Sequence, residues 1–164
     1  MGNVYVSKAT IEFLRDQSLQ WIEAIAESDE ERHVIRALAE KESHLYPLAV
    51  RFEPALLKQD WYRKACESKG FDPDNPWNAC SYGLVQVLFV TALDYDGDLP
   101  SARELLSEPR HALWCGVEHL RKLRRRFTLY SALSAYNAGR PVNSNRESYV
   151  LPILRRIEEL EAGE

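Results

Sequence analysis

Glu42 is the side chain whose position in the sequence best suits acid–base chemistry. Ile35, Leu38 and Glu42 are separated by three and four residues, so a helix would carry the carboxyl at the end of its apolar stripe. A carboxyl on an apolar face loses hydration, and near a helix C-terminus it also meets the negative end of the helix dipole. Both effects favour the protonated form that a general acid needs near neutral pH. The alternative is a side chain at a frayed helix end that reaches solvent.

Four short segments carry further hydroxyl, amide and phenol side chains. Such groups can hydrogen-bond a polar ligand, and a phenol also presents a flat apolar face. Read singly, each such residue also has a structural explanation as a core aromatic, a helix cap or an ordinary amide. The segments are Glu42-Ser43, Gly83-Leu84-Val85-Gln86, Ala135-Tyr136-Asn137-Ala138-Gly139 and Tyr149-Val150.

Taken in this order, the four segments resemble the motifs of the soluble lytic transglycosylase (SLT) domain family, which shares the lysozyme-like helical fold with goose-type lysozymes. The resemblance covers roughly residues 37–157. It implies an all-α, lysozyme-like domain with a cleft. We expect a single domain over residues 1–164, with the motif-bearing part at about 29–160.

The resemblance also implies a role for each matching residue. Glu42 matches the catalytic acid/base of the family, and Tyr149 matches a late tyrosine whose hydroxyl lies close to that carboxyl. The residues expected to bind substrate are Ser43, Ser81, Gln86, Tyr136, Asn137 and Tyr149. No cofactor and no metal is expected.

Two features depart from the family pattern. Val85 stands where the family has Met, and the stretch between Glu42 and Gly83 is longer than the family usually has. That stretch contains Arg51-Phe52-Glu53-Pro54, a string that resembles phage-type cell-wall muramidases. It favours a phage or prophage endolysin.

The chemistry implied by the resemblance needs no nucleophile residue, because substrate-assisted glycosidases form the new bond from the substrate itself. Glu42 would protonate the glycosidic oxygen between N-acetylmuramic acid and N-acetylglucosamine, then accept the C6 hydroxyl proton as a 1,6-anhydro product closes. A first alternative is a hydrolytic muramidase on the same fold, in which Asp94, Asp96 or Asp98 activates water. A second is a non-catalytic glycan-binding or virion structural module.

The aspartate run, Asp94-Tyr95-Asp96-Gly97-Asp98, also suggests a calcium loop. A hand-type loop requires Gly at its sixth position and Glu at its twelfth, where this chain has Leu99 and Leu105. The mismatch argues against metal binding.

Composition excludes several other classes of protein. The chain has 164 residues, 45% of them hydrophobic, which suits a folded core rather than disorder. Its net charge of −4 argues against nucleic-acid binding, and the basic run 121–126 fits a solvated helix face. The longest apolar run, Gly83–Leu93, is interrupted and too short for a membrane span, so no integral membrane association is expected.

The beginning of the chain, MGNVYVSKATIEF, shows no secretory signal. We therefore expect synthesis in the cytoplasm of a bacterial host and holin-dependent release to the wall, or association with a virion. Peptidoglycan glycan strands are the expected partner, and a monomer the expected state. Cys66, Cys80 and Cys115 fit reduced, buried thiols, with a Cys66–Cys80 bridge left open.

Helical spacing, capping residues and breakers predict the elements that would position these residues. Ser28 with Glu31 forms a capping box before a helix that runs to Ser43. Residues 83–92 fit a strand or a buried helix, and the helical surroundings favour a helix. The other predicted helices are 7–28, a short one within 55–68, one or two turns at 100–106, 109–127, 129–138 ending at Gly139, and 149–160.

Overall fold

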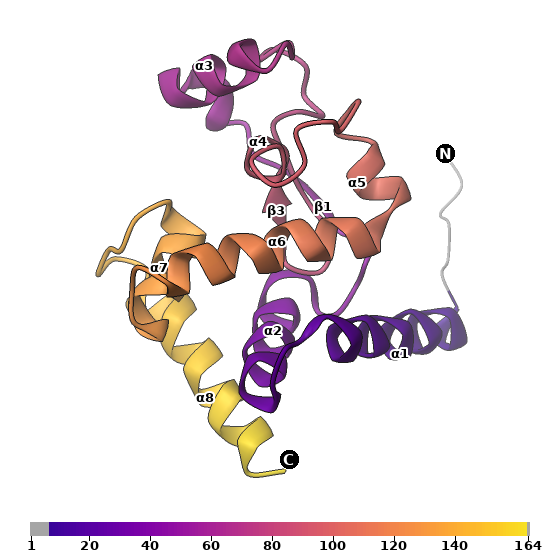
Figure 1. Ribbon diagram of the computed structural model, residues 1–164. Coiled ribbons are helices and arrows are strands. Elements are labelled where there is room, and N and C mark those ends of the chain that lie inside the picture. The colour runs from indigo at the N-terminus through magenta and orange to yellow at the C-terminus, as the bar shows by residue number, and fades with distance from the viewer. Residues whose placement is uncertain (1–6, 164) are drawn as a thin grey trace.

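The structure, a computed structural model, describes residues 7–163 and is predominantly helical, as the sequence predicts (Figure 1). The chain also contains a 3-10 turn at Leu56–Lys58 and a π-helical turn at Arg146–Val150. The helices are α1 (Lys8–Ile25), α2 (Asp29–Ser43), α3 (Asp60–Ser68), α4 (Phe89–Ala92), α5 (Glu104–Ser107), α6 (Pro109–Arg124), α7 (Leu129–Ala138) and α8 (Leu151–Glu161).

The predicted helix start at Ser28 is confirmed. The Ser28 hydroxyl accepts a hydrogen bond from the Glu31 amide at 3.1 Å, which satisfies one of the free amides of the first turn of α2. The Glu31 carboxylate accepts from the Glu27 amide at 2.7 Å, one residue before the partner that a capping box would use. The predicted end of α7 is also confirmed, because Gly139 adopts the left-handed conformation (φ 74°) that ends helices.

The helix α6 crosses the middle of the molecule in Figure 1, with α1, α2 and α8 on one side and α3, α4 and α5 on the other. The largest buried cluster joins α1, α2, α6, α7 and α8 to Leu84 and Val85. Its members include Ile22, Leu38, Leu84, Leu113 and Ile153. This cluster holds the C-terminal end of α2 against the start of α8.

A small antiparallel sheet departs from the predicted pattern. It consists of β1 (Val50–Phe52), β2 (Cys80–Tyr82) and β3 (Val87–Leu88), in the order β1-β2-β3. The helix expected over residues 83–92 is therefore wrong in its first half, and α4 begins only at Phe89. The reason is local: Gly83 (φ 73°) and Gln86 (φ 50°) are left-handed and turn the chain between β2 and β3.

The basic run 121–126 is not solvated throughout. The Arg121 side chain is 17% exposed, and its guanidinium donates to the Glu31 carboxylate at 2.8 Å and to the Ile25 carbonyl at 3.0 Å. It thereby ties α6 to the junction of α1 and α2.

The three cysteines are free and buried. Within residues 7–163, no helix combines the length and the apolar composition that crossing a membrane requires. The prediction of a missing secretory signal falls partly on residues 1–6, which lie outside the described residues.

Candidate active site

A cavity of about 940 Å³ lies where α2, the sheet, α6 and α7 meet, and it extends to α3. Its lining brings together acidic, basic, amide and aromatic side chains, which include Glu42, Arg51, Glu53, Trp61, Ser81, Gln86, Leu88, His119, Tyr136, Asn137 and Arg140. Five of the seven predicted site residues therefore line one cavity.

Glu42 occupies the last turn of α2 and continues its buried stripe, as predicted. Ile35 and Leu38 are buried, and the Glu42 side chain is only 6% exposed. The helix ends in an ordered way, because His44 and Leu45 are left-handed and their amides bond back to carbonyls of the last turn. The carboxyl is therefore fixed at the cavity wall, and a frayed helix end that reaches solvent is excluded.

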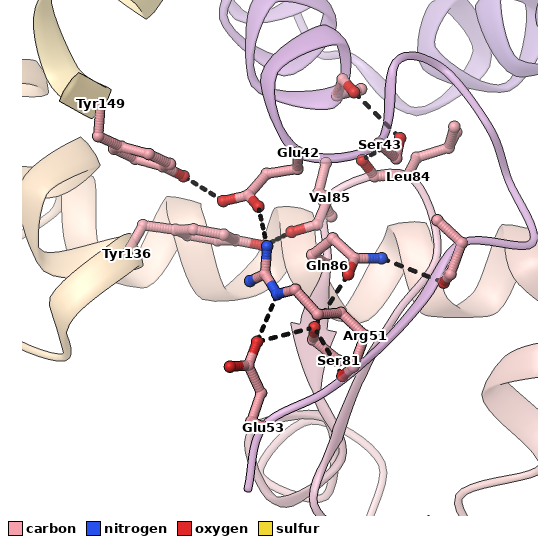
Figure 2. A network of polar contacts seen from close by, with 12 residues as sticks. Glu42, Ser43, Arg51, Glu53, Ser81, Leu84, Val85, Gln86, Tyr136 and Tyr149 are labelled. Carbon is pink, nitrogen blue, oxygen red and sulfur yellow. Dashed lines mark hydrogen bonds and ion pairs between the residues drawn. The ribbon is translucent and has the colours of Figure 1, made fainter. Parts of the chain in front are cut away.

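Two side chains from distant parts of the chain contact the Glu42 carboxyl (Figure 2). The Tyr149 hydroxyl donates a hydrogen bond to Oε1, and the Arg51 guanidinium lies 3.6 Å from Oε2. Tyr149 comes from the π-helical turn just before α8. Such turns are frequent at functional sites, and this one presents Tyr149 toward α2.

The pKa of Glu42 is raised, chiefly because burial disfavours the charged form. The hydrogen bond from Tyr149 and the positive charge of Arg51 lower this pKa, and the negative charge of Glu53 raises it again. Burial also raises the pKa of Tyr149 far above its usual range, with the neighbouring Glu42 carboxylate acting in the same direction. Tyr149 therefore stays protonated and remains a donor to Glu42.

One face of the sheet forms the wall of the cavity. Arg51 pairs with Ser81, and Ser81 pairs with Leu88, so these three side chains project from the same face. Glu53 and Gln86 follow at a spacing of two residues from Arg51 and Leu88, and both also line the cavity. The register of three short strands thus assembles this wall.

Ser81 and Gln86 form a buried polar network in this wall (Figure 2). The Ser81 hydroxyl donates to the Gln86 side-chain oxygen at 2.9 Å. The Gln86 amide nitrogen donates to the carbonyls of Gly83 at 2.9 Å and Ala49 at 3.1 Å. Both of its donor hydrogens are thereby used, so Gln86 shapes the wall and holds the turn between β2 and β3.

Tyr136 and Asn137 reach the cavity from the end of α7. The Tyr136 hydroxyl donates to the Val85 carbonyl at 2.9 Å, which fixes the ring beside Glu42 (Figure 2). The Asn137 side-chain oxygen accepts from Asn145 at 3.0 Å. Asn137 itself is exposed, so its amide nitrogen can meet a ligand.

Ser43 lies outside this cavity, which differs from the expected sugar contact. Its buried hydroxyl donates to the Ala39 carbonyl at 3.0 Å and to the Leu84 carbonyl at 2.8 Å. The residue next to Glu42 therefore ties α2 to the turn that precedes Gln86, and it positions the site without facing it.

The aspartates considered for water activation also lie elsewhere. Asp94 pairs with Lys69 at 2.6 Å and Asp96 pairs with His111 at 3.0 Å. Neither of them lines the cavity, and Asp98 does not line it either. The second carboxylate of the cavity is Glu53, which is ion-paired with Arg51. Within residues 7–163, no group of three metal-type side chains lies close enough together to hold an ion.

Three further cavity residues were not predicted from the sequence. Trp61 and Arg140 belong to no motif, and His119 carries no ligand spacing. Burial lowers the pKa of His119, so the imidazole that lines the cavity there is neutral. Only the fold could bring these residues to Glu42, because each lies in a different segment.

A buried, protonatable carboxyl facing an open cavity of phenols and amides is the arrangement by which lysozyme-type helical proteins present an acid to a glycan. The fold and the cavity place the protein in that class. A family model described as the transglycosylase SLT domain matches residues 20–150, and the chain belongs to this family. Membership implies peptidoglycan degradation of the lytic transglycosylase type. No curated protein and no solved structure matches the chain.

Proposed function

We propose that the protein cleaves the β-1,4 bond between N-acetylmuramic acid and N-acetylglucosamine and releases 1,6-anhydro-muramic ends. The observation that carries this proposal is the buried Glu42 carboxyl with a raised pKa and a fixed phenol donor, Tyr149. Residues 1–164 act as one catalytic domain. Ile22 near the end of α1 and Leu160 in α8 belong to the same buried cluster, which supports a single domain.

The proposed reaction needs one residue in two protonation states. Protonated Glu42 donates to the glycosidic oxygen as the bond from that oxygen to C1 of the muramic ring breaks. The resulting carboxylate is stabilised by the Tyr149 hydrogen bond and by the Arg51 charge. It then takes the proton of the C6 hydroxyl as that oxygen bonds to C1. Atoms balance without water, and Glu42 ends protonated.

Hydrolysis is the second candidate, because Glu53 shares the cavity and Arg51 with Glu42. Depending on its distance from the acid, a second carboxylate could activate water, which gives inversion, or act as the nucleophile, which gives retention. This version of the muramidase alternative rests on Glu53 and not on the aspartates at 94–98.

Digestion of purified peptidoglycan, followed by mass spectrometry of the fragments, separates the two candidates. We expect fragments one water lighter than hydrolysed ones. Glu53→Gln should keep these products and lose less than about tenfold in rate, because it removes only a partly exposed ion pair. Products that contain the added water and disappear in Glu53→Gln would establish hydrolysis instead.

The charge of Arg51 should set the alkaline limit of activity. Glu42 must be protonated to act, so the rate falls as pH rises through its pKa. Arg51 lowers that pKa, and its removal leaves the opposing charge of Glu53 in place. Arg51→Gln is therefore expected to move the alkaline limb of the kcat profile to higher pH.

Arg140→Gln is the matched control, because Arg140 lines the same cavity and no ion pair joins it to Glu42 within the described residues. It should leave the limb in place. An unmoved or lowered limb in Arg51→Gln would show that Arg51 does not act on Glu42.

We also propose a role in phage-type lysis or wall penetration, either after holin-dependent release or as part of a virion. The string Arg51-Phe52-Glu53-Pro54 supports this role, since two of its residues stand in the cavity wall. Detection of the protein in purified virions would favour the virion form over the free endolysin.

A further inference from the structure

We propose that Trp61 is the stacking platform of an outer saccharide subsite, which holds a neutral N-acetylhexosamine of the same glycan strand. The inference rests on the proposed function and extends it to a segment of the chain outside the recognised motifs. Trp61 is 52% exposed and lines the same cavity as Glu42.

The arrangement of the elements indicates that Trp61 serves a different ring from the one at Glu42. Glu42 lies in the last turn of α2 and Trp61 in the first turn of α3, and the strands lie between these two helices in Figure 1. The cavity of about 940 Å³ lies near the upper end of the roughly 300–1,000 Å³ typical of small-molecule sites. It can therefore hold more than the two rings joined by the scissile bond.

The surroundings of Trp61 fit a neutral sugar. The cavity residues nearest to it in sequence are Leu56 and Gln59, and Leu88 and Thr91 come from the adjoining end of β3 and α4. These four side chains carry no charge. An indole face stacks on the apolar face of a pyranose, and a side-chain amide or hydroxyl can hydrogen-bond an N-acetyl group. The charged wall of Arg51 and Glu53 lies on β1 and just after it.

The platform is held rigidly although Trp61 itself is exposed. Its neighbour Tyr62 is fully buried, donates to the Pro73 carbonyl at 3.3 Å and meets the Trp61 ring edge-on at 6.2 Å. Arg63 forms a double hydrogen bond with Asp74, at 2.6 and 3.1 Å. Among the hydrogen bonds within residues 7–163, none uses the Trp61 indole N–H, which leaves it available to a ligand. A preorganised aromatic face binds with little loss of conformational entropy.

Binding of the N-acetylglucosamine hexamer to the inactive Glu42→Gln protein, measured by calorimetry, tests this subsite. Adding Trp61→Ala should weaken binding roughly tenfold, because it removes the stacking surface. Trp61→Phe should recover most of the affinity, whereas Trp61→Leu, which keeps apolar bulk without a flat face, should not. Should the alanine variant fail to fold, the Phe and Leu pair still decides the question.

Trp77→Ala is the matched control. Trp77 is similarly exposed, at 39%, but it lies under the Arg103 guanidinium and does not line the cavity. It should leave hexamer affinity unchanged. Equal affinities for the Trp61 variants and their parent would overturn the subsite, as would an equal loss in Phe and Leu or no hexamer binding at all. None of these results bears on the peptidoglycan products, which decide the proposed reaction separately.

Discussion

Glu42→Gln is expected to reduce the cleavage of peptidoglycan by between about 10²- and 10⁴-fold, the usual contribution of a general acid. The amide cannot donate a proton to the glycosidic oxygen or take one from the C6 hydroxyl. It can still accept the Tyr149 hydrogen bond, so the cavity should keep its shape. The measurement is the rate of release of soluble fragments by the purified variant and by the wild type.

The same substitution should leave the protein as stable as the wild type at neutral pH, or more stable. Burial raises the pKa of Glu42 in the folded state, so the folded state binds more protons than the unfolded one above the ordinary glutamate pKa. Ionised Glu42 therefore lowers the free energy of unfolding, and this loss grows as pH rises from the ordinary glutamate pKa to the raised pKa of the folded state. Gln removes this pH dependence.

Glu67→Gln, an exposed site on α3, is the control for the chemical change itself and should alter neither activity nor Tm. Near-normal cleavage by folded Glu42→Gln would remove Glu42 from the mechanism. Loss of cleavage together with a large fall in Tm would show a structural role instead.

Gly116→Val is expected to destabilise the fold by about 3 kcal/mol or more, the upper end of overpacking effects. A Cβ at this position would lie 2.3 Å from Val85 Cγ2 and 2.9 Å from the Tyr136 hydroxyl oxygen. Val85 is β-branched and fully buried, which leaves its side chain little freedom to relieve this contact. For a chain of this size, Tm should fall by at least roughly 6 °C in thermal unfolding.

Activity should fall as well, even well below the new Tm. The added methyl groups displace the Tyr136 hydroxyl from the Val85 carbonyl, and this bond fixes the ring beside Glu42. Gly97→Val is the matched control, because a Cβ there meets only one backbone oxygen at 4.0 Å. An unchanged Tm in Gly116→Val would mean that α6 can move away from the turn between β2 and β3 at no cost.

The helices could largely be predicted from the sequence, since their information is local. Apolar residues at helical spacing and the caps Ser28 and Gly139 mark α2 and α7 within a residue or two. The sheet could not be predicted, because strands of two or three residues are too short to show alternation. The segment 83–92 is helical only at its C-terminal end, because the left-handed residues Gly83 and Gln86 form a turn at its start.

By itself, the sequence indicated Glu42 as the candidate acid and determined the family of the chain. Glu42 continues an apolar stripe, and four ordered motifs accompany it, all readable from spacing along the chain. Only the tertiary structure determined which side chains surround Glu42. Arg51 and Glu53 meet it through strand register, Ser43 turns to a backbone carbonyl, and Trp61 joins the same cavity. Side chains far apart in the chain come within contact distance only when helix packing and strand register bring their segments together.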